Sequence, residues 1–195
     1  MIPDAVIEVL EGPCKLRAAD FVLAPLCDAD IDDMFAHFAD PRVTEFLDID
    51  PVEARFQAWD LIDWAAAVRA AGTGLRWSIR DEAGDFVGSC GFHTLTYLRG
   101  RRGEIGYDLR ADRWGQGVMG QILPAMLDFG FGPLDLHRVE ALVTPGNERS
   151  CAVLARHGFE REGLLRGYGF WRERFWDQIL FSRLRGGVEP KSATA

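Results

Sequence analysis

The spacing of apolar residues in the first third of the chain predicts two helices. Apolar side chains at 31, 34, 35 and 38 share one helical face, and acidic residues fill the first turn of segment 28–38. A second helix is expected over about 51–71, because Pro51 stands in its first turn and Gly72 follows its end. Between the two helices, segment 40–50 is predicted to be a loop with a single turn. The aromatic residues of the second helix, which we expect in the core, are Phe56, Trp59 and Trp64.

Alternating apolar and polar positions predict strands through most of the remaining chain. Two further helices are indicated, one beginning near residue 121 and one over 148–157, which Asn147 caps and Gly158 ends. We therefore predict a mixed α/β domain around one central sheet. The predicted strands are 21–25, 75–80, 86–94, 104–109, 138–143, 164–170 and 175–184.

The two ends of the chain are expected to lie outside this domain. Residues 1–15 are predicted to be an N-terminal extension, irregular up to residue 14 apart from a short strand over 6–10. The domain itself should span 16–185, and residues 186–195 are expected to be a disordered tail.

Composition supports a single globular domain. The chain has 195 residues, of which 48% are hydrophobic and 27% charged. No apolar run is long enough to cross a membrane, and the start Met1–Asp4 lacks the basic region of a signal peptide. We therefore expect a cytoplasmic protein with no membrane partner. Four cysteines without a CxxC pair make a metal site or a disulfide framework a weak interpretation.

The net charge of −8 is unevenly distributed. Residues 1–75 carry about −10, whereas residues 76–195 carry about +2. This division fits an anionic cofactor bound by the second part and a cationic partner accepted by the first. Solvated acidic helices would explain it equally simply. The overall acidity disfavours nucleic acid as a partner.

A glycine-rich segment, Arg113–Gly120, joins strand 104–109 to the next helix. Such a turn points several backbone N–H groups at one spot near a helix start, which favours binding of phosphate. The run Gly115–Gly120 also matches the dinucleotide pattern GxGxxG. However, five residues separate it from the strand, and about a hundred precede it, so a nicotinamide-dependent oxidoreductase is only a remote alternative. A purely structural turn also remains possible.

Five segments in order resemble the GNAT acetyltransferase superfamily, and more closely its RimJ/RimL-like branch. They are Glu104–Tyr107, Trp114–Gly120, Asn147–Phe159, and the late pieces 161–166 and 175–180. The sequence departs from the common pattern at Trp114, where many relatives have Gln or Arg, and at Met119, where many have Gly or Ala. The resemblance implies a central, mostly antiparallel sheet of about seven strands, splayed in the middle and flanked by about four helices.

The resemblance further implies acetyl-CoA as cosubstrate, without a metal. Backbone N–H groups of the glycine loop would hold its pyrophosphate, Asn147 would bond the pantetheine arm, and Arg156 would reach the adenosine phosphates. The cofactor-binding residues implied in this way are Tyr107, Asp108, Leu109, Trp114, Gly115, Gln116, Gly117, Val118, Met119, Gly120, Asn147 and Arg156.

The implied reaction is direct transfer of acetyl to an amine, with no acyl-enzyme. Glu104 is our candidate base, and Ser150 our candidate proton donor to the leaving thiolate, while the backbone N–H of Leu109 could polarise the carbonyl. Simpler roles compete, since Glu104 could pair with an arginine and Ser150 could cap a helix. The reserve bases are His93, Asp108 and Glu45.

The acceptor is expected to be a cationic amine, such as a protein N-terminus, a polyamine or an aminoglycoside. This expectation rests on the acidic residues Asp40, Glu45, Asp48, Asp50 and Glu53. The alternative from another class is a non-catalytic sensor that binds an acyl-CoA. Strand-edge pairing or a shared final hairpin makes a homodimer possible.

Overall fold

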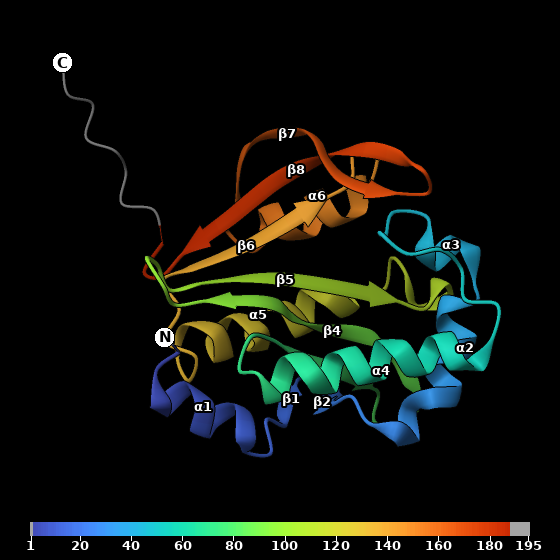
Figure 1. Cartoon of the computed structure of the whole chain (residues 1–195), viewed down its shortest axis with the longest axis horizontal. Coiled ribbons are helices and arrows are strands. Elements are labelled where there is room, and N and C mark those ends of the chain that lie inside the picture. The colour runs from blue at the N-terminus through green and yellow to red at the C-terminus, as the bar shows by residue number, and fades with distance from the viewer. Residues whose placement is uncertain (1, 188–195) are drawn as a thin grey trace.

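The computed structural model describes residues 2–187, which form one eight-stranded sheet with helices on both faces (Figure 1). The strands lie in the order β1-β2-β3-β4-β5-β6-β8-β7. Within these residues only β5 and β6 pair in parallel. The strands are Leu16–Ala18 (β1), Phe21–Pro25 (β2), Leu75–Arg80 (β3), Phe86–Thr96 (β4), Arg102–Leu109 (β5), Arg138–Val143 (β6), Glu160–Trp171 (β7) and Arg174–Leu184 (β8).

Six α-helices accompany the sheet in this part of the chain, so the mixed α+β prediction is confirmed with slightly higher counts of both elements. The additions to the predicted set are β1, α1 and α3, and of these β1 and α3 are too short to show a clear periodic pattern. The helices are Asp4–Glu11 (α1), Ile31–Phe38 (α2), Pro41–Thr44 (α3), Arg55–Ala70 (α4), Val118–Phe131 (α5) and Glu148–Arg156 (α6).

The first helix, α1, corrects the predicted strand over residues 6–10. Val6 and Leu10 are four residues apart, so they share one helical face, and both are buried. Arg69 of α4 donates a hydrogen bond to the carbonyl oxygen of Leu10 at 2.8 Å, which fixes the helix against α4. Two buried residues four positions apart, such as Val6 and Leu10, fit both a strand and a helix. The tertiary contacts decide for the helix.

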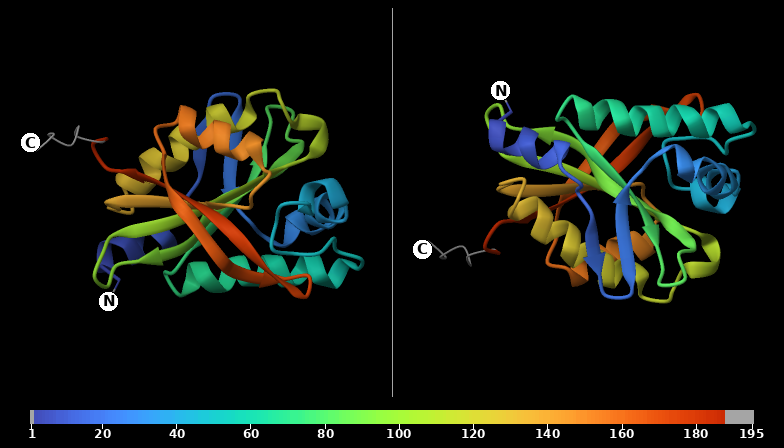
Figure 2. Two further views of the ribbon diagram at one scale, coloured as in Figure 1. Left: turned by 90° about the horizontal axis from the view of Figure 1, so that it is seen from above. Right: turned by 90° about the horizontal axis from the view of Figure 1, so that it is seen from below.

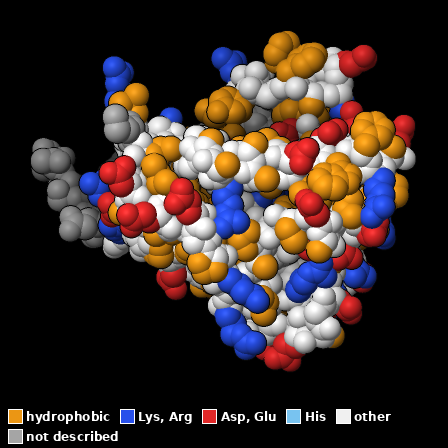
Figure 3. Space-filling view, turned by 60° about the horizontal axis from the view of Figure 1, so that its bottom comes forward, with side chains coloured by type: hydrophobic (Ala, Val, Ile, Leu, Met, Phe, Trp, Pro, Cys, Tyr) orange, Lys and Arg blue, Asp and Glu red, His pale blue; other side chains and the backbone are white. Residues whose placement is uncertain are grey.

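Helix α4 begins later than predicted and buries different residues. The side chain of Gln57 accepts hydrogen bonds from the backbone N–H groups of Glu53 and Ala54, so the helix starts at Arg55 rather than near Pro51. Small and aliphatic side chains form its packed face, and the expectation that its aromatic residues are buried is wrong. Phe56 is 66% exposed, and Trp59 and Trp64 are each 39% exposed. Figure 3 shows hydrophobic side chains lying among charged ones on the surface.

The helices cover the sheet in two layers, with α5 and α6 on one face and α2 and α4 on the other (Figure 2). On the first face, Trp77 of β3 packs edge-on against Phe129 of α5, with ring centroids 5.4 Å apart. On the second, Met34 of α2 and Ile62 of α4 belong to a separate buried cluster. Successive residues of β3 and of β5 therefore face different helix pairs.

Residues 188–195, which contain most of the predicted tail, lie outside the described residues. Among residues 2–187, none of the helices has the length and apolar character required to cross a membrane.

Candidate functional site

The parallel pairing of β5 with β6 stops halfway along both strands. The register joins 102–105 to 138–141, after which β5 follows β4 to Leu109 and β6 follows β8 to Val143. Beyond this point the facing backbone groups have no partner in the sheet. The predicted splay is confirmed, and it opens at Gly106.

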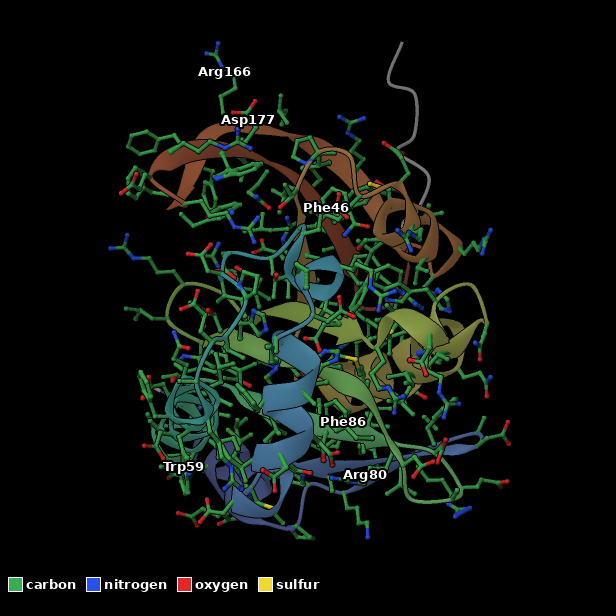
Figure 4. All side chains as sticks on the ribbon, turned by 90° about the vertical axis from the view of Figure 1, so that its right-hand side faces the viewer. Phe46, Trp59, Arg80, Phe86, Arg166 and Asp177 are labelled. Atoms are coloured by element: carbon green, nitrogen blue, oxygen red, sulfur yellow. The ribbon has the colours of Figure 1, made fainter. Side chains whose placement is uncertain are left out.

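A cavity of about 690 Å³ occupies the opening. It continues toward the β7–β8 hairpin, and Figure 4 shows Phe46 beneath that hairpin while Arg166 points away from the molecule. Arg172 holds the hairpin to the segment after α3, because it donates hydrogen bonds to the carbonyl oxygens of Thr44 at 2.8 Å and Ile49 at 2.9 Å. The polar side chains on the cavity wall include Asp48, Arg76, His93, Glu104, Asp108, Asn147, Ser150 and Gln178.

The glycine loop supplies free backbone donors at the start of α5. Gly115 and Gly117 have φ angles of +74° and +76°, a conformation that glycine adopts without strain. Gly117 is the N-cap residue, and no side chain caps the helix. The first N–H groups of α5 are therefore available to an anion at the positive end of the helix dipole.

The side chains of the loop bond to neighbouring backbone or pack in the core, and they do not point into the opening between β5 and β6. Trp114 donates from Nε1 to the carbonyl oxygen of Leu109 at 2.8 Å, and Gln116 donates to the carbonyl oxygen of Asp112 at 2.6 Å. Val118 and Met119 are buried in the core. Contact between these residues and a cofactor would therefore run mainly through the backbone.

Asn147 and Ser150 stand at the start of α6, facing the cavity. Asn147 caps the helix by accepting a hydrogen bond from the Ser150 N–H at 3.2 Å. The Ser150 hydroxyl lies 2.7 Å from the Tyr107 hydroxyl, and burial raises the pKa of Tyr107 to about 12 although this bond opposes the rise. The sequence did not predict this pair, because the two residues come from β5 and α6. The hydroxyls together form a short chain of proton donors beside the opening.

Arg156 is exposed at the end of α6. Nε2 of the next residue, His157, lies 3.1 Å from the carbonyl oxygen of Gly120, so the end of α6 is beside the start of α5. A contact between Arg156 and the adenosine phosphates stays a prediction.

Glu104 lies partly buried on β5, directly opposite Glu140 of β6. Burial raises the pKa of the Glu104 carboxyl, and the nearby charges of Glu140 and Asp48 raise it further. The charge of Arg102 partly opposes this rise, while Arg138 bonds Glu140 and Glu162. Within residues 2–187, Glu104 has no ion pair, so the competing role of a strand-face carboxylate paired with an arginine is not what the structure contains.

Asp108 is fully engaged and cannot serve as the reserve base. Its carboxylate bonds Arg76, accepts a hydrogen bond from His37 Nε2 at 2.7 Å, and accepts one from the Ser89 hydroxyl at 2.9 Å. Burial alone would raise the pKa of Asp108, but these partners outweigh it and hold the pKa below its ordinary value. Its side chain therefore belongs to a buried charged network, which leaves only its backbone for the cofactor.

His93 is also unsuited to the role of reserve base. Burial and the adjacent Arg76 lower the pKa of His93 to about 3, against a smaller opposing effect of Asp108. Arg76 Nη1 donates to His93 Nε2, so the ring lone pair that could accept a proton is already used. The histidine is neutral throughout the physiological pH range.

The acidic residues of the α2–α4 region differ in whether they form an ion pair and whether they line the cavity. Asp40 bonds Arg42 at 2.6 Å, and Asp50 bonds Arg172 at 3.0 Å. Glu45 and Glu53 are exposed. Of the five acids predicted to attract an amine, Asp48 is the one on the cavity wall.

The chemistry of the opening fits acetyl-CoA. The uncapped start of α5 suits its phosphates, and the unpaired edges of β5 and β6 suit its amide-containing arm. Within the described residues no group of three histidine, cysteine or acidic side chains could hold a metal ion.

Comparison with known proteins gives one consistent family. A family model for the acetyltransferase (GNAT) domain matches residues 20–160. The uncharacterized N-acetyltransferase p20 of Bacillus licheniformis is 36% identical over 157 residues, which cover 80% of this chain and 88% of p20.

Two solved structures with bound coenzyme have the same fold. Mycobacterium smegmatis RimJ in complex with CoA-disulfide has a TM-score of 0.78 and 27% identity, with 88% of this chain and 86% of RimJ covered. Spermidine N-acetyltransferase from Vibrio cholerae, in complex with CoA and spermine, has a TM-score of 0.74 and 19% identity. The match covers 85% of this chain and 96% of that enzyme. The chain belongs to the GNAT superfamily, in its RimJ/RimL-like branch, and is an acetyl-CoA-dependent N-acetyltransferase.

Proposed function

We propose that this enzyme transfers acetyl from acetyl-CoA directly to the primary amine of a cationic substrate, without an acyl-enzyme. The observation that carries the proposal is Glu104, a carboxylate without an ion pair on the cavity wall whose pKa is raised by burial and by Glu140. A base with a raised pKa accepts the proton of an ammonium group more readily than an ordinary carboxylate does. Glu104 takes this proton directly or through one water molecule.

The acyl transfer itself needs alignment and two further hydrogen-bond donors. The free amine attacks the thioester carbonyl carbon, and the backbone N–H of Leu109 polarises the carbonyl oxygen. The bond from this carbon to sulfur breaks, and Ser150 with Tyr107 supplies the proton that the leaving thiolate takes up. The second proton, which the attacking nitrogen loses as the amide forms, returns through solvent to the hydroxyl pair. Their 2.7 Å contact supports a shared role, because each hydroxyl can pass a proton to the other.

The glycine loop would hold the pyrophosphate of acetyl-CoA, with contacts from Gly115 to Gly120. Asn147 and the free edge of β5 at Tyr107, Asp108 and Leu109 would bind the pantetheine arm. The uncapped start of α5 and the unpaired edge of β5 support these roles.

A cationic acceptor is supported by the composition of the cavity wall. Asp48 and Glu104 lie there beside the aromatic side chains Phe46, Tyr168 and Trp171. Carboxylates and aromatic faces both attract an ammonium group. The comparison structures include one in complex with spermine, which is such an amine. A homodimer through β7, the last strand of the sheet, remains a prediction.

The test is an acetyl-CoA turnover screen over peptides with a free N-terminus, polyamines and aminoglycosides. Turnover is measured as release of the CoA thiol. We expect saturable thiol release with at least one cationic amine. Binding of CoA, seen as a rise in melting temperature, without thiol release across the panel would instead favour the sensor alternative.

A further inference from the structure

Three independent features place the imidazole of His93 on the cavity wall. His93 is the additional residue of a β-bulge in β4, since Phe92 pairs with Ile105 and Thr94 with Glu104. A bulge re-aims one side chain of a strand, and bulges are frequent next to active sites.

The second feature is Gly106, across which the ring lies. A Cβ atom at Gly106 would be 2.2 Å from His93 Cε1 and 2.5 Å from its Nε2. These contacts are too close for any side chain, so glycine is required at this position for the ring to lie there. Gly106 is also the first residue of β5 beyond the pairing with β6.

The third feature is the anchoring of the ring by charged groups. Arg76 of β3 donates to His93 Nε2 and also bonds the buried carboxylate of Asp108. A guanidinium group can only donate, so Nε2 must accept and the single ring proton must be on Nδ1. Trp64 of α4 packs against the ring with its ring centroid 5.6 Å away, and Glu104 and Asp48 line the same cavity.

This arrangement leaves one unused donor. No acceptor among residues 2–187 bonds Nδ1 of His93, whereas Nε2 is bonded and the residue lines the cavity. On β5, Glu104, Gly106 and Asp108 share one face, and Tyr107 is on the other with Ser150. His93 therefore lies on the side of Glu104, where the proposed function places the amine.

We propose that His93 is a substrate-binding residue whose Nδ1–H donates a hydrogen bond to an oxygen atom next to the reacting amine. Arg76 and Asp108 are positioning residues that fix its tautomer. The inference rests on the proposed function and narrows it to amines that carry a carbonyl or similar acceptor beside the amino group. An amine without such an oxygen leaves the donor unpaired, which disfavours its binding.

The tautomer is tested by nuclear magnetic resonance on the ¹⁵N-labelled full-length chain, with His93→Gln used to assign the signals. We expect a proton on Nδ1, a lone pair on Nε2, and no titration between about pH 5 and 9, unlike an unperturbed histidine with a pKa of about 6.5. A proton on Nε2, or titration in this range, would overturn the assignment. This readout does not depend on turnover.

The substrate contact is tested with alaninamide and an isostere in which an isopropyl group replaces the carboxamide. Alaninamide, but not the isostere, should shift the Nδ1 proton signal, whether or not acetyl transfer follows. In turnover assays His93→Leu should lower kcat/KM for alaninamide about tenfold, mainly through KM, a size expected for one hydrogen bond.

The loss in kcat/KM for the isostere should be about tenfold smaller than that for alaninamide, because the ratio of the two losses, in a cycle of two enzymes and two substrates, cancels general effects of the substitution. His93→Gln, which keeps a donor, should restore most of the loss. Equal losses for both amines, or no loss for either, would overturn the inference. Absence of thiol release from any amine, with the expected signal shift retained, would instead count against the proposed function.

Discussion

His37 and Asp108, which are 71 positions apart in the chain, meet in the interior at 2.7 Å. The imidazole Nε2 donates to the carboxylate, while His37 Nδ1 is buried without a hydrogen-bond partner in the described structure. Asp108 also bonds Arg76 and Ser89, so one carboxylate joins α2, β3 and β4 to the end of β5.

Asp108→Asn should therefore lower the free energy of unfolding by about 3–5 kcal/mol, because it leaves the buried Arg76 without a counter-charge. Urea denaturation measures this change. The control Asp135→Asn removes exposed pairs with Arg101 and Arg185 and should change stability by less than about 1 kcal/mol.

The pH dependence of Asp108 has a definite sign. Because its pKa is lower in the folded protein, its ionisation stabilises the fold above its unfolded pKa of about 3.9, and this contribution is lost as pH falls further. The Asp108→Asn variant should lack this acid-dependent contribution to the free energy of unfolding. Equal acid sensitivity in both proteins would contradict the assignment.

Glu104→Gln should lower kcat by about 10²- to 10⁴-fold, the usual range for loss of a general base. In the native enzyme, activity should fall as pH drops through the raised pKa of Glu104, and this limb should disappear from the variant. The matched variant Glu140→Gln removes a like charge and should move the limb to lower pH. A Glu104→Gln enzyme with full turnover would remove the base assignment.

Ser150→Ala and Tyr107→Phe should each lower kcat by about ten- to a hundredfold, at the low end of effects for acid–base groups, with acetyl-CoA affinity retained. Since the two hydroxyls act as one chain, the double variant should lose little more than the stronger single variant. Stopped-flow or steady-state thiol release checks this pattern. Multiplicative losses would show that the hydroxyls act separately.

Gly120→Ala separates cofactor binding from folding. A Cβ atom there would meet only His157 Cε1, at 4.0 Å, so the fold tolerates it, and alanine should raise stability by about 0.5–1 kcal/mol in a helix. Acetyl-CoA affinity should nevertheless fall, because the methyl group keeps the pyrophosphate from the backbone. Calorimetric titration and thermal melting measure the two effects. Unchanged affinity would mean that the phosphates bind elsewhere.

Asp48→Asn should raise KM for a cationic amine several-fold, because it removes one unit of charge from the cavity wall. Asp50→Asn is the matched control, since Asp50 is paired with Arg172 and should affect KM little. Acetyl-CoA affinity should hold in both variants. A similar rise in KM for the two would indicate long-range attraction instead of a local contact.

The elements with a regular pattern were predictable from the sequence. Helix α2 keeps a helical spacing of apolar residues throughout, and strand β6 keeps a strict alternation. The glycine loop is recognised by glycine spacing that favours phosphate binding. Short or ambiguous segments were not, since α1 depends on contacts with α4. The exposure of Phe56 on α4 was missed because the helix buries alanine and isoleucine instead.

The proposed cofactor-binding residues come from local motifs in the sequence, but the charged network of the candidate site does not. Glu104 could be proposed from its place on a strand, whereas its freedom from an ion pair depends on the tertiary arrangement of the nearby arginines. The engagement of Asp108 and His93 depends on a bulge and on Arg76, which is 32 residues from Asp108. Spacing in the sequence carries no signal for such contacts.

The alternation of side chains along β5 also determines on which side of the strand each proposed proton transfer occurs. Glu104 and Tyr107 are on opposite sides of one strand, so the proposed mechanism has the strand separate the base from the proton donor. A slip of β5 by one residue would exchange the two sides. The hydrogen bond from the Ser89 backbone to the Asp108 carboxylate, at 3.1 Å, joins the paired residues of β4 and β5 and so supports this register.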